Sequence, residues 1–160
     1  MNSFIQIDSI SDNFAMILLK FIKNDKYNKN KTAEIMAYNT SIPMNFEFLR
    51  LYIYEIAKTL ELEVNTLIYS FSLIDSFLEK SNIKLTNKNV LSITITAISL
   101  AVKYLEDFIY DTKTLCEFCD ISIKDFVLLE IIFLQIIEYK LYLSTEIFQQ
   151  YEEYLTNRGS

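Results

Sequence analysis

The sequence predicts a single all-α domain, and three observations lead to that prediction. Only one glycine and one proline occur in 160 residues, so the turn residues on which sheets depend are scarce. Hydrophobic residues make up 51% of the chain, enough for a packed core without metal or disulfide. Apolar residues recur at three- and four-residue intervals, as in helices. We expect a five-helix bundle around a buried central helix, preceded by a short accessory N-terminal helix.

The stretch Asn89–Asp107 is predicted to be the central helix. From Asn89 to Val102 it carries no charged side chain, glycine or proline, so none of its faces is suited to water. A helix that is apolar all round lies inside a protein, and this uncharged run is shorter than the roughly 18 residues of a membrane span. Ala97 and Ala101 are small enough to let neighbouring helices approach closely. We therefore expect the other helices to pack around this one.

The N-terminal part is predicted to be an accessory segment. Ser11 and Asp12 are suitable N-caps for a short helix over the apolar run Phe14–Ile22, whose length suggests an appendage on the core. The following segment, Lys23–Thr32, is rich in lysine and asparagine and is typical of a solvated linker.

Domain boundaries follow from this pattern. Residues 1–40 are predicted to hold the N-terminal helix and the linker, and residues 41–157 the helical core domain. The last three residues, 158–160, resemble a cloning remnant. We find no internal repeat, so one helical unit is expected.

The core helices are predicted from apolar periodicity and from capping residues. Pro43 stands at the start of the first, where proline is tolerated. Thr86-Asn87 is predicted to cap the central helix, and Ser122 with Asp125 forms a capping box before the next one. The predicted core helices are Met44–Leu60, Glu63–Lys80, the central helix, a helix over Phe126–Ile137 and a last helix from Ser144, with one helical turn between Asp111 and Cys119.

The residue types needed for catalysis or for metal binding are scarce. Histidine is absent, which removes the nucleophile systems and metal sites that depend on it. Cys116 and Cys119 form the only cysteine pair, without the strand of a redox site or the further ligands of a zinc site, so we predict reduced packing thiols. With Gly159 as the only glycine, no phosphate-binding loop can form. We predict no enzymatic activity, no metal and no cofactor.

The net charge of the chain limits the classes of partner that it can bind. A formal net charge of −6 argues against direct contact with nucleic acid, whose phosphates attract basic surfaces. No membrane span is expected, and the first residues lack the features of a signal peptide. We therefore predict an intracellular protein of the nucleus, the cytoplasm or both.

Two apolar runs, both predicted to form buried helices, each carry one charge, and the two charges have opposite signs. Lys103 interrupts the central helix, and Glu130 interrupts the run Phe126–Ile137. A buried charge without a partner is costly, so each must reach water, another charge or a partner protein. Two interpretations are open: an internal Lys103–Glu130 bridge, or two charges on a common surface that receives a second chain.

Three sequence motifs resemble the cyclin family. LIDSFL (Leu73–Leu78) resembles the family's Y-I-D-R-F-L motif, and ISLAVKYLED (Ile98–Asp107) its L-L-A-x-K-F-x-E/D motif. LLEIIFLQIIEYKLYLS (Leu128–Ser144) is similar to its E-x-x-x-L-x-x-L-x-F-x-L helix. The motifs follow in the family's order, and the resemblance extends from about Ile42 to Leu155. It implies a cyclin box fold.

Within the family, the chain most resembles the single-box, phosphate-regulatory cyclins of the P or U type. The opening Ser41–Arg50 and the run Tyr104–Tyr110 carry this likeness. The resemblance implies a regulatory subunit that binds and activates a cyclin-dependent kinase by moving its regulatory helix into place. It further implies that Lys103 and Glu130 contact the kinase, and that the chain is monomeric apart from that kinase.

Two departures from the family pattern affect these expectations. Ser76 replaces the arginine that follows the aspartate of the second-helix motif, which removes an ion pair from the fold. Asn45 and Tyr52 stand where many cyclins carry methionine and tryptophan in a hydrophobic substrate-docking patch. Asn45, Leu49 and Tyr52 are therefore only a candidate patch.

Two other functions compete with the kinase-binding hypothesis. A cyclin-box transcription adaptor would contact promoter DNA and should be basic, which this chain is not. A helical bundle that holds an apolar ligand would account for the many aromatic residues, although core packing accounts for them as well.

Overall fold

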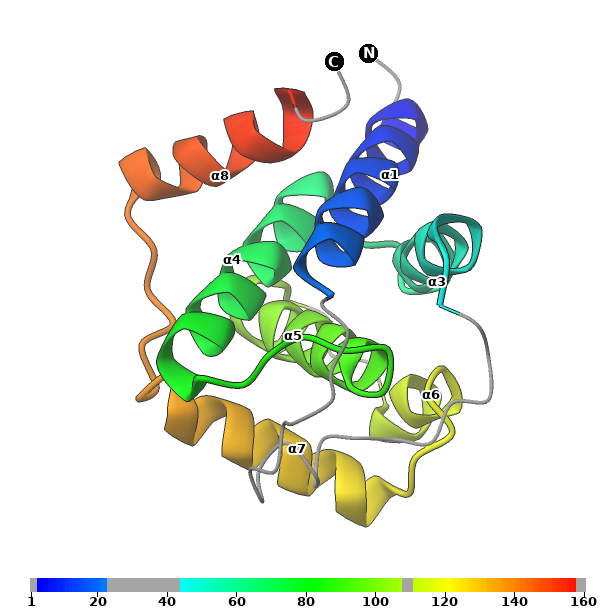
Figure 1. The fold of residues 1–160 in the computed structure, drawn as a ribbon, viewed down its shortest axis with the longest axis vertical. Coiled ribbons are helices and arrows are strands. Elements are labelled where there is room, and N and C mark those ends of the chain that lie inside the picture. Colours follow the sequence, from blue (N-terminus) through cyan, green and yellow to red (C-terminus); the bar gives the residue numbers. More distant parts are fainter. Residues whose placement is uncertain (1–2, 23–43, 108–110, 158–160) are drawn as a thin grey trace.

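The computed structural model describes residues 3–22, 44–107 and 111–157, and over these ranges it consists of helices without a strand (Figure 1). The all-α prediction is confirmed. The linker Lys23–Thr32, Pro43 and residues 158–160 lie outside the described residues. The helices are α1 (Ser3–Phe21), α3 (Phe46–Thr59), α4 (Val64–Ser81), α5 (Val90–Leu105), α6 (Thr112–Glu117), α7 (Ile123–Ile136) and α8 (Thr145–Asn157).

Helix α5 is the predicted central helix, and the structure buries it all round. Every residue from Val90 to Val102 is buried, including the small residues Ala97 and Ala101. Its polar side chains bond to its own backbone: the Ser92 hydroxyl donates to the Asn89 carbonyl, and the Thr96 hydroxyl to the Ser92 carbonyl. Such local bonds let hydroxyl groups enter an apolar core without being left unsatisfied.

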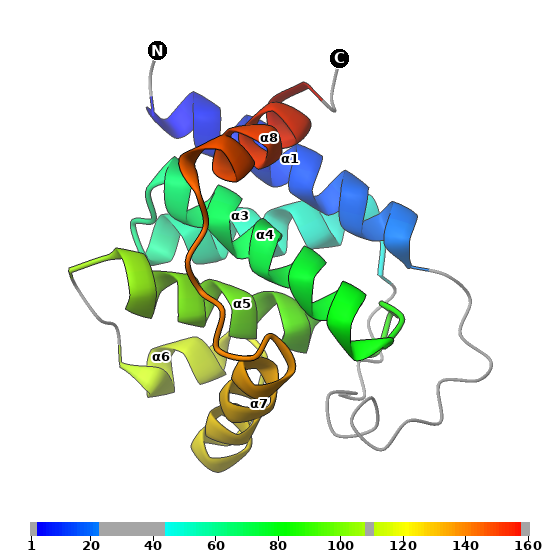
Figure 2. The same ribbon diagram turned by 90° about the vertical axis from the view of Figure 1, so that its left-hand side faces the viewer.

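Helix α4 connects the two ends of the molecule. It packs against α5 and α7 on one side and against α1 and α8 on the other, so it contacts more of the fold than α5 does (Figures 1 and 2). Phe71 and Phe77 of α4 are both almost completely buried. The Phe77 ring stacks on Phe133 of α7 at a centroid distance of 4.5 Å. The predicted bundle is present, but α4 rather than α5 links most of its helices.

Helix α1 is part of the core, which corrects the prediction of a short appendage. It spans 19 residues and begins at Ser3, well before the predicted cap at Ser11 or Asp12. Ser11 lies inside the helix and is fully buried. The Asn13 side chain donates a hydrogen bond of 2.6 Å to the Leu155 carbonyl of α8. A boundary near residue 41 therefore does not separate α1 from the rest of the core.

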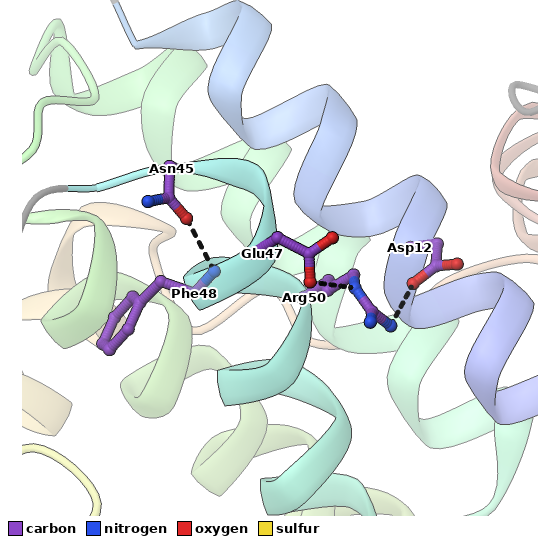
Figure 3. Close-up of polar contacts among 5 residues, drawn as sticks. All are labelled: Asp12, Asn45, Glu47, Phe48 and Arg50. Atoms are coloured by element: carbon purple, nitrogen blue, oxygen red, sulfur yellow. Dashed lines mark hydrogen bonds and ion pairs between the residues drawn. The ribbon is translucent and has the colours of Figure 1, made fainter.

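An ion-pair chain fixes the first turns of α3 to α1 (Figure 3). The Arg50 guanidinium lies 3.4 Å from Asp12 of α1 and 3.2 Å from Glu47 one turn earlier on α3. The Asn45 side chain caps α3 by accepting a hydrogen bond of 2.8 Å from the Phe48 backbone. These contacts set where α3 begins and how it lies against α1.

The predicted helix starts are confirmed in part. The Ser122 hydroxyl accepts a bond from the Asp125 backbone, and the Ser144 hydroxyl caps the first turn of α8. Thr86 caps the turn that leads into α5: its hydroxyl accepts from the Asn89 backbone while the Asn89 side chain accepts from the Thr86 backbone, as in a capping box. Helix α5 consequently begins at Val90, later than the predicted cap implied.

Of the described helices that end at a left-handed residue other than glycine, α3, α6 and α7 close in the same way. Glu61, Asp120 and Glu138 have φ angles of 49°, 50° and 58°. Immediately after each of them, a backbone N–H bonds to a carbonyl five residues earlier, as Leu62 does to Ala57. This is the Schellman arrangement, in which glycine is the usual left-handed residue. These three helix ends therefore carry strained residues with side chains.

We expect Glu61→Gly to stabilise the protein by about 0.5 kcal/mol. Relief of the left-handed strain, about 1–2 kcal/mol, exceeds the added unfolded-state entropy of glycine, about 0.5–1 kcal/mol. The matched change Glu55→Gly, on the exposed face of α3, should instead destabilise by about 1 kcal/mol. Urea unfolding of both variants measures the difference, and equal destabilisation would contradict the left-handed helix end.

Candidate partner-binding face

Lys103 and Glu130 form an ion pair between α5 and α7. Lys103 stands in the last turn of α5, and its Nζ lies 2.9 and 2.8 Å from the two carboxylate oxygens of Glu130. The Ser99 hydroxyl, one turn earlier on α5, donates a further bond of 3.1 Å to Glu130. In the described structure the first interpretation, an internal bridge, is therefore realised.

The two ends of this bridge differ in exposure. The Glu130 side chain is 9% exposed, whereas the Lys103 side chain is 35% exposed. Two of the three ammonium hydrogens of Lys103 can serve Glu130, which leaves one for another acceptor. The bridge thus reaches the surface through its lysine, and its formation does not exclude contact with a partner.

Helix α7 presents an apolar face to the solvent, which corrects the prediction that its run is buried. Only one side, with Phe126, Leu129 and Phe133, lies in the core. The opposite side carries four exposed apolar side chains, which we call the α7 apolar face. They are Ile123 (51% exposed), Val127 (42%), Leu128 (44%) and Ile131 (44%).

The ion pair lies at the edge of the α7 apolar face. A helix advances by about 100° per residue, so Glu130 and Val127 project about 60° apart around α7. Glu130 is therefore the boundary between the buried side of α7 and its exposed apolar side. Helix α7 therefore places an exposed apolar stripe directly beside a charged pair.

The connection between α5 and α7 includes α6 and both cysteines. Asp111 caps α6 by accepting a bond from the Lys113 backbone. Cys116 is buried, and both thiols are free. Burial is the main cause that raises the pKa of Cys119 to about 12, and it also raises the pKa of Cys116. Both groups are thiols rather than nucleophilic thiolates at neutral pH.

The candidate substrate-docking patch does not form a surface, which corrects that prediction. Asn45 caps α3 (Figure 3). Leu49 is fully buried in the core. The Tyr52 hydroxyl is buried and has no hydrogen-bond partner among the described residues. Its burial raises the Tyr52 pKa well above the usual value of a phenol. The three residues therefore present no joint apolar surface for a substrate.

Asp75, the aspartate of the LIDSFL motif, bonds to α8 in place of a neighbouring arginine. Tyr151 of α8 donates a hydrogen bond of 2.6 Å to the Asp75 carboxylate. Burial and this bond raise the pKa of Tyr151, so the phenol keeps the proton that it donates. Ser76 leaves the ion pair of the family pattern missing, and the tyrosine gives Asp75 a different partner.

Among the described residues, no group of three or more His, Cys, Asp or Glu side chains could hold a metal ion. None of the described helices combines the length and the apolar content needed to cross a bilayer.

The fold and this site define an all-helical domain of the cyclin-box class, in which helices pack around a buried central one. A family model described as the cyclin N-terminal domain matches residues 17–142, which is more than half of the chain. The chain therefore belongs to the cyclin family and carries a single cyclin box. A comparison with curated proteins found no match.

The family assignment makes the protein a cyclin-like regulator. The matched region begins within α1 and ends before α8, so it includes both Lys103 and Glu130. The exposed apolar side of α7 is the feature of this face that the sequence did not predict. A possible signal was the scarcity of charge in α7, where only Glu130 interrupts the run Phe126–Ile136, but a similar pattern occurs in α5, which is buried.

Proposed function

We propose that the chain is a regulatory subunit that binds and activates a cyclin-dependent kinase through the α7 apolar face and Lys103. The observation that carries this proposal is the row of exposed Ile, Val and Leu side chains beside a half-exposed ion pair. Contiguous apolar surface edged by polar groups is typical of protein–protein interfaces.

The chemistry of the face fits a helix of the kinase as the partner element. An apolar stripe along α7 can pack against a second apolar helix, while the remaining hydrogen of Lys103 can bond to a carbonyl or carboxylate of the partner. Binding favours the active kinase only to the extent that the face contacts the active position of that helix better than the inactive one. The active position completes the Lys–Glu ion pair of the kinase. The regulator itself supplies no catalytic group in this mechanism.

The cellular location is part of the same proposal. Because cyclin-dependent kinases act inside cells, the chain would work in the nucleus, the cytoplasm or both. The acidic net charge of −6 further supports a protein partner over nucleic acid.

The test is affinity purification of the tagged full chain, with mass spectrometry and a kinase assay of the eluate. The key variant, Val127→Asp with Ile131→Asp, places charges on the α7 apolar face. It should reduce kinase recovery at least about tenfold, since exposed residues at the centre of an interface can each contribute about 2 kcal/mol or more.

The matched control is Ile147→Asp, which changes an equally exposed isoleucine on α8. It should recover the kinase normally, and thermal melts should show that all variants are folded. If the α7 variant recovered as much kinase as the unchanged chain, the assignment of the α7 apolar face as the binding surface would be contradicted. Recovery of nucleic acid without a kinase would favour a transcription adaptor, and recovery of neither would favour a ligand-binding bundle.

A further inference from the structure

A second surface feature lies where four helices meet, at the beginning of α1 and α4 and the end of α3 and α8. Two adjoining hollows there have volumes of about 670 and 750 Å³ and share Gln6, Val64 and Asn65 in their walls. One hollow runs between α1, α4 and α8, and the other continues along the turn from α3 to α4. We call the two together the acidic groove.

One wall of the acidic groove is apolar. Ile7 and Ile10 of α1 contribute to it, together with Leu62 and Ile68 from the α3–α4 turn and from α4. These side chains are almost fully buried, so they form a firm wall instead of mobile surface groups. A groove of this volume with apolar walls is large enough to receive aliphatic side chains.

The rim of the acidic groove is strongly negative. Glu61 and Glu63 lie on the α3–α4 turn, and Glu152 and Glu153 on α8, whereas Lys58 is the only basic residue among the described lining residues. These four glutamates form no ion pair with another described residue. The rim therefore has a surplus of carboxylates without counter-charges.

Another carboxylate adds to this surplus beside the first turn of α4. Glu106 accepts a hydrogen bond of 3.0 Å from the Thr66 hydroxyl and one of 3.5 Å from the Glu63 backbone. Its contacts are neutral donors, which leave its negative charge in place. The potential at this end of the molecule is thus set by several carboxylates together.

The position of the acidic groove leaves it free when α7 is covered. The groove is formed by the ends of α1 and α8, which lie at the opposite end of the molecule from α7 (Figures 1 and 2). Helix α4 spans the distance between the two ends. A partner on the α7 apolar face would therefore not compete with a ligand in the groove.

We propose that the acidic groove binds a basic peptide segment of a partner protein, with lysine or arginine at the rim and an aliphatic side chain against the apolar wall. Charge complementarity selects this occupant, because the carboxylates repel nucleic acid, phosphates and acidic peptides. A second copy of this chain, with a net charge of −6, is repelled as well. The inference is independent of the kinase proposal, since it concerns a different surface.

The experiment measures binding of a short fluorescent peptide of lysine and leucine to the full chain by anisotropy. Glu63→Gln with Glu153→Gln should weaken binding roughly five- to tenfold, because each exposed ion pair accounts for about a two- to fivefold change in affinity. The control, Glu79→Gln with Glu117→Gln, removes the same charge from exposed positions outside the groove and should change affinity less than about twofold.

Two further arms test the specificity of the site. A peptide with serine in place of leucine should bind more weakly, because it lacks the aliphatic side chain. The Val127→Asp and Ile131→Asp variant should bind the leucine peptide as tightly as the unchanged chain, whether or not α7 binds a kinase. The proposal would be overturned if both peptides bound equally or if both glutamate pairs had equal effects. It would also be overturned if the chain self-associated and the groove variant abolished that self-association.

Discussion

Lys103→Ala should destabilise the free chain more than Glu130→Ala. Without Lys103, the nearly buried Glu130 carboxylate keeps only the Ser99 hydroxyl as a donor. Without Glu130, the lysine is 35% exposed and can turn to water. Breaking a fully buried pair costs about 3–5 kcal/mol, and the exposure of this pair reduces our expectation to about 2–3 kcal/mol for Lys103→Ala and about 1 kcal/mol for Glu130→Ala. Thermal and urea melts measure both values.

The double variant Lys103→Met with Glu130→Leu separates the structural role of the pair from its proposed role in binding. Apolar groups of similar size often replace a buried pair at little cost, so this variant should be more stable than Lys103→Ala. If the pair also contacts a kinase, the stable double variant should bind that kinase less. Normal kinase binding by the double variant would restrict the pair to its internal role. A double variant less stable than Lys103→Ala would contradict the view that the unpaired Glu130 carboxylate causes the instability of Lys103→Ala.

Phe14→Ala should destabilise the protein by about 3–5 kcal/mol, the usual range for a buried phenylalanine. Phe14 of α1 is fully buried and meets Phe71 of α4 edge to face, with ring centroids 5.3 Å apart. Since a domain is stable by only about 5–15 kcal/mol, the loss would be a large part of the total. Urea unfolding measures it directly.

The exposed residue Lys20 provides the control on the same helix. Lys20→Ala should change the stability by less than about 0.5 kcal/mol, because it removes no core contact. If Phe14→Ala were as mild as Lys20→Ala, α1 would be an appendage after all.

Local chemistry made several features predictable from the sequence. A helix without charge, glycine or proline over Asn89–Val102 has no face suited to water, so burial of α5 followed directly. The caps at Ser122 and Ser144 depend on residues three positions apart, so they too could be recognised in sequence. The opposite charges of Lys103 and Glu130 were recognised, and a pair was one of two open interpretations.

Features that depend on contacts between segments distant in the chain could not be predicted from the sequence. Ser11 and Asp12 looked like a helix start, but both lie inside α1, and the adjacent Asn13 donates a hydrogen bond to Leu155 of α8. Leu49 was placed on a candidate surface, although α3 turns that side chain into the core. Periodicity states that a helix has an apolar face, but not which neighbour covers it.

The sequence by itself determined the all-α class, the cyclin likeness, the buried α5 and the two lone charges. Only the tertiary structure decided that α1 is core, that α7 leaves an apolar face exposed, and that four helix ends gather carboxylates around one groove. The physical reason is that composition and periodicity are local, whereas burial and surface potential are sums over neighbours brought together by folding. The runs of α5 and α7 are similarly apolar, and they differ because α5 lies inside the bundle whereas α7 lies at its edge.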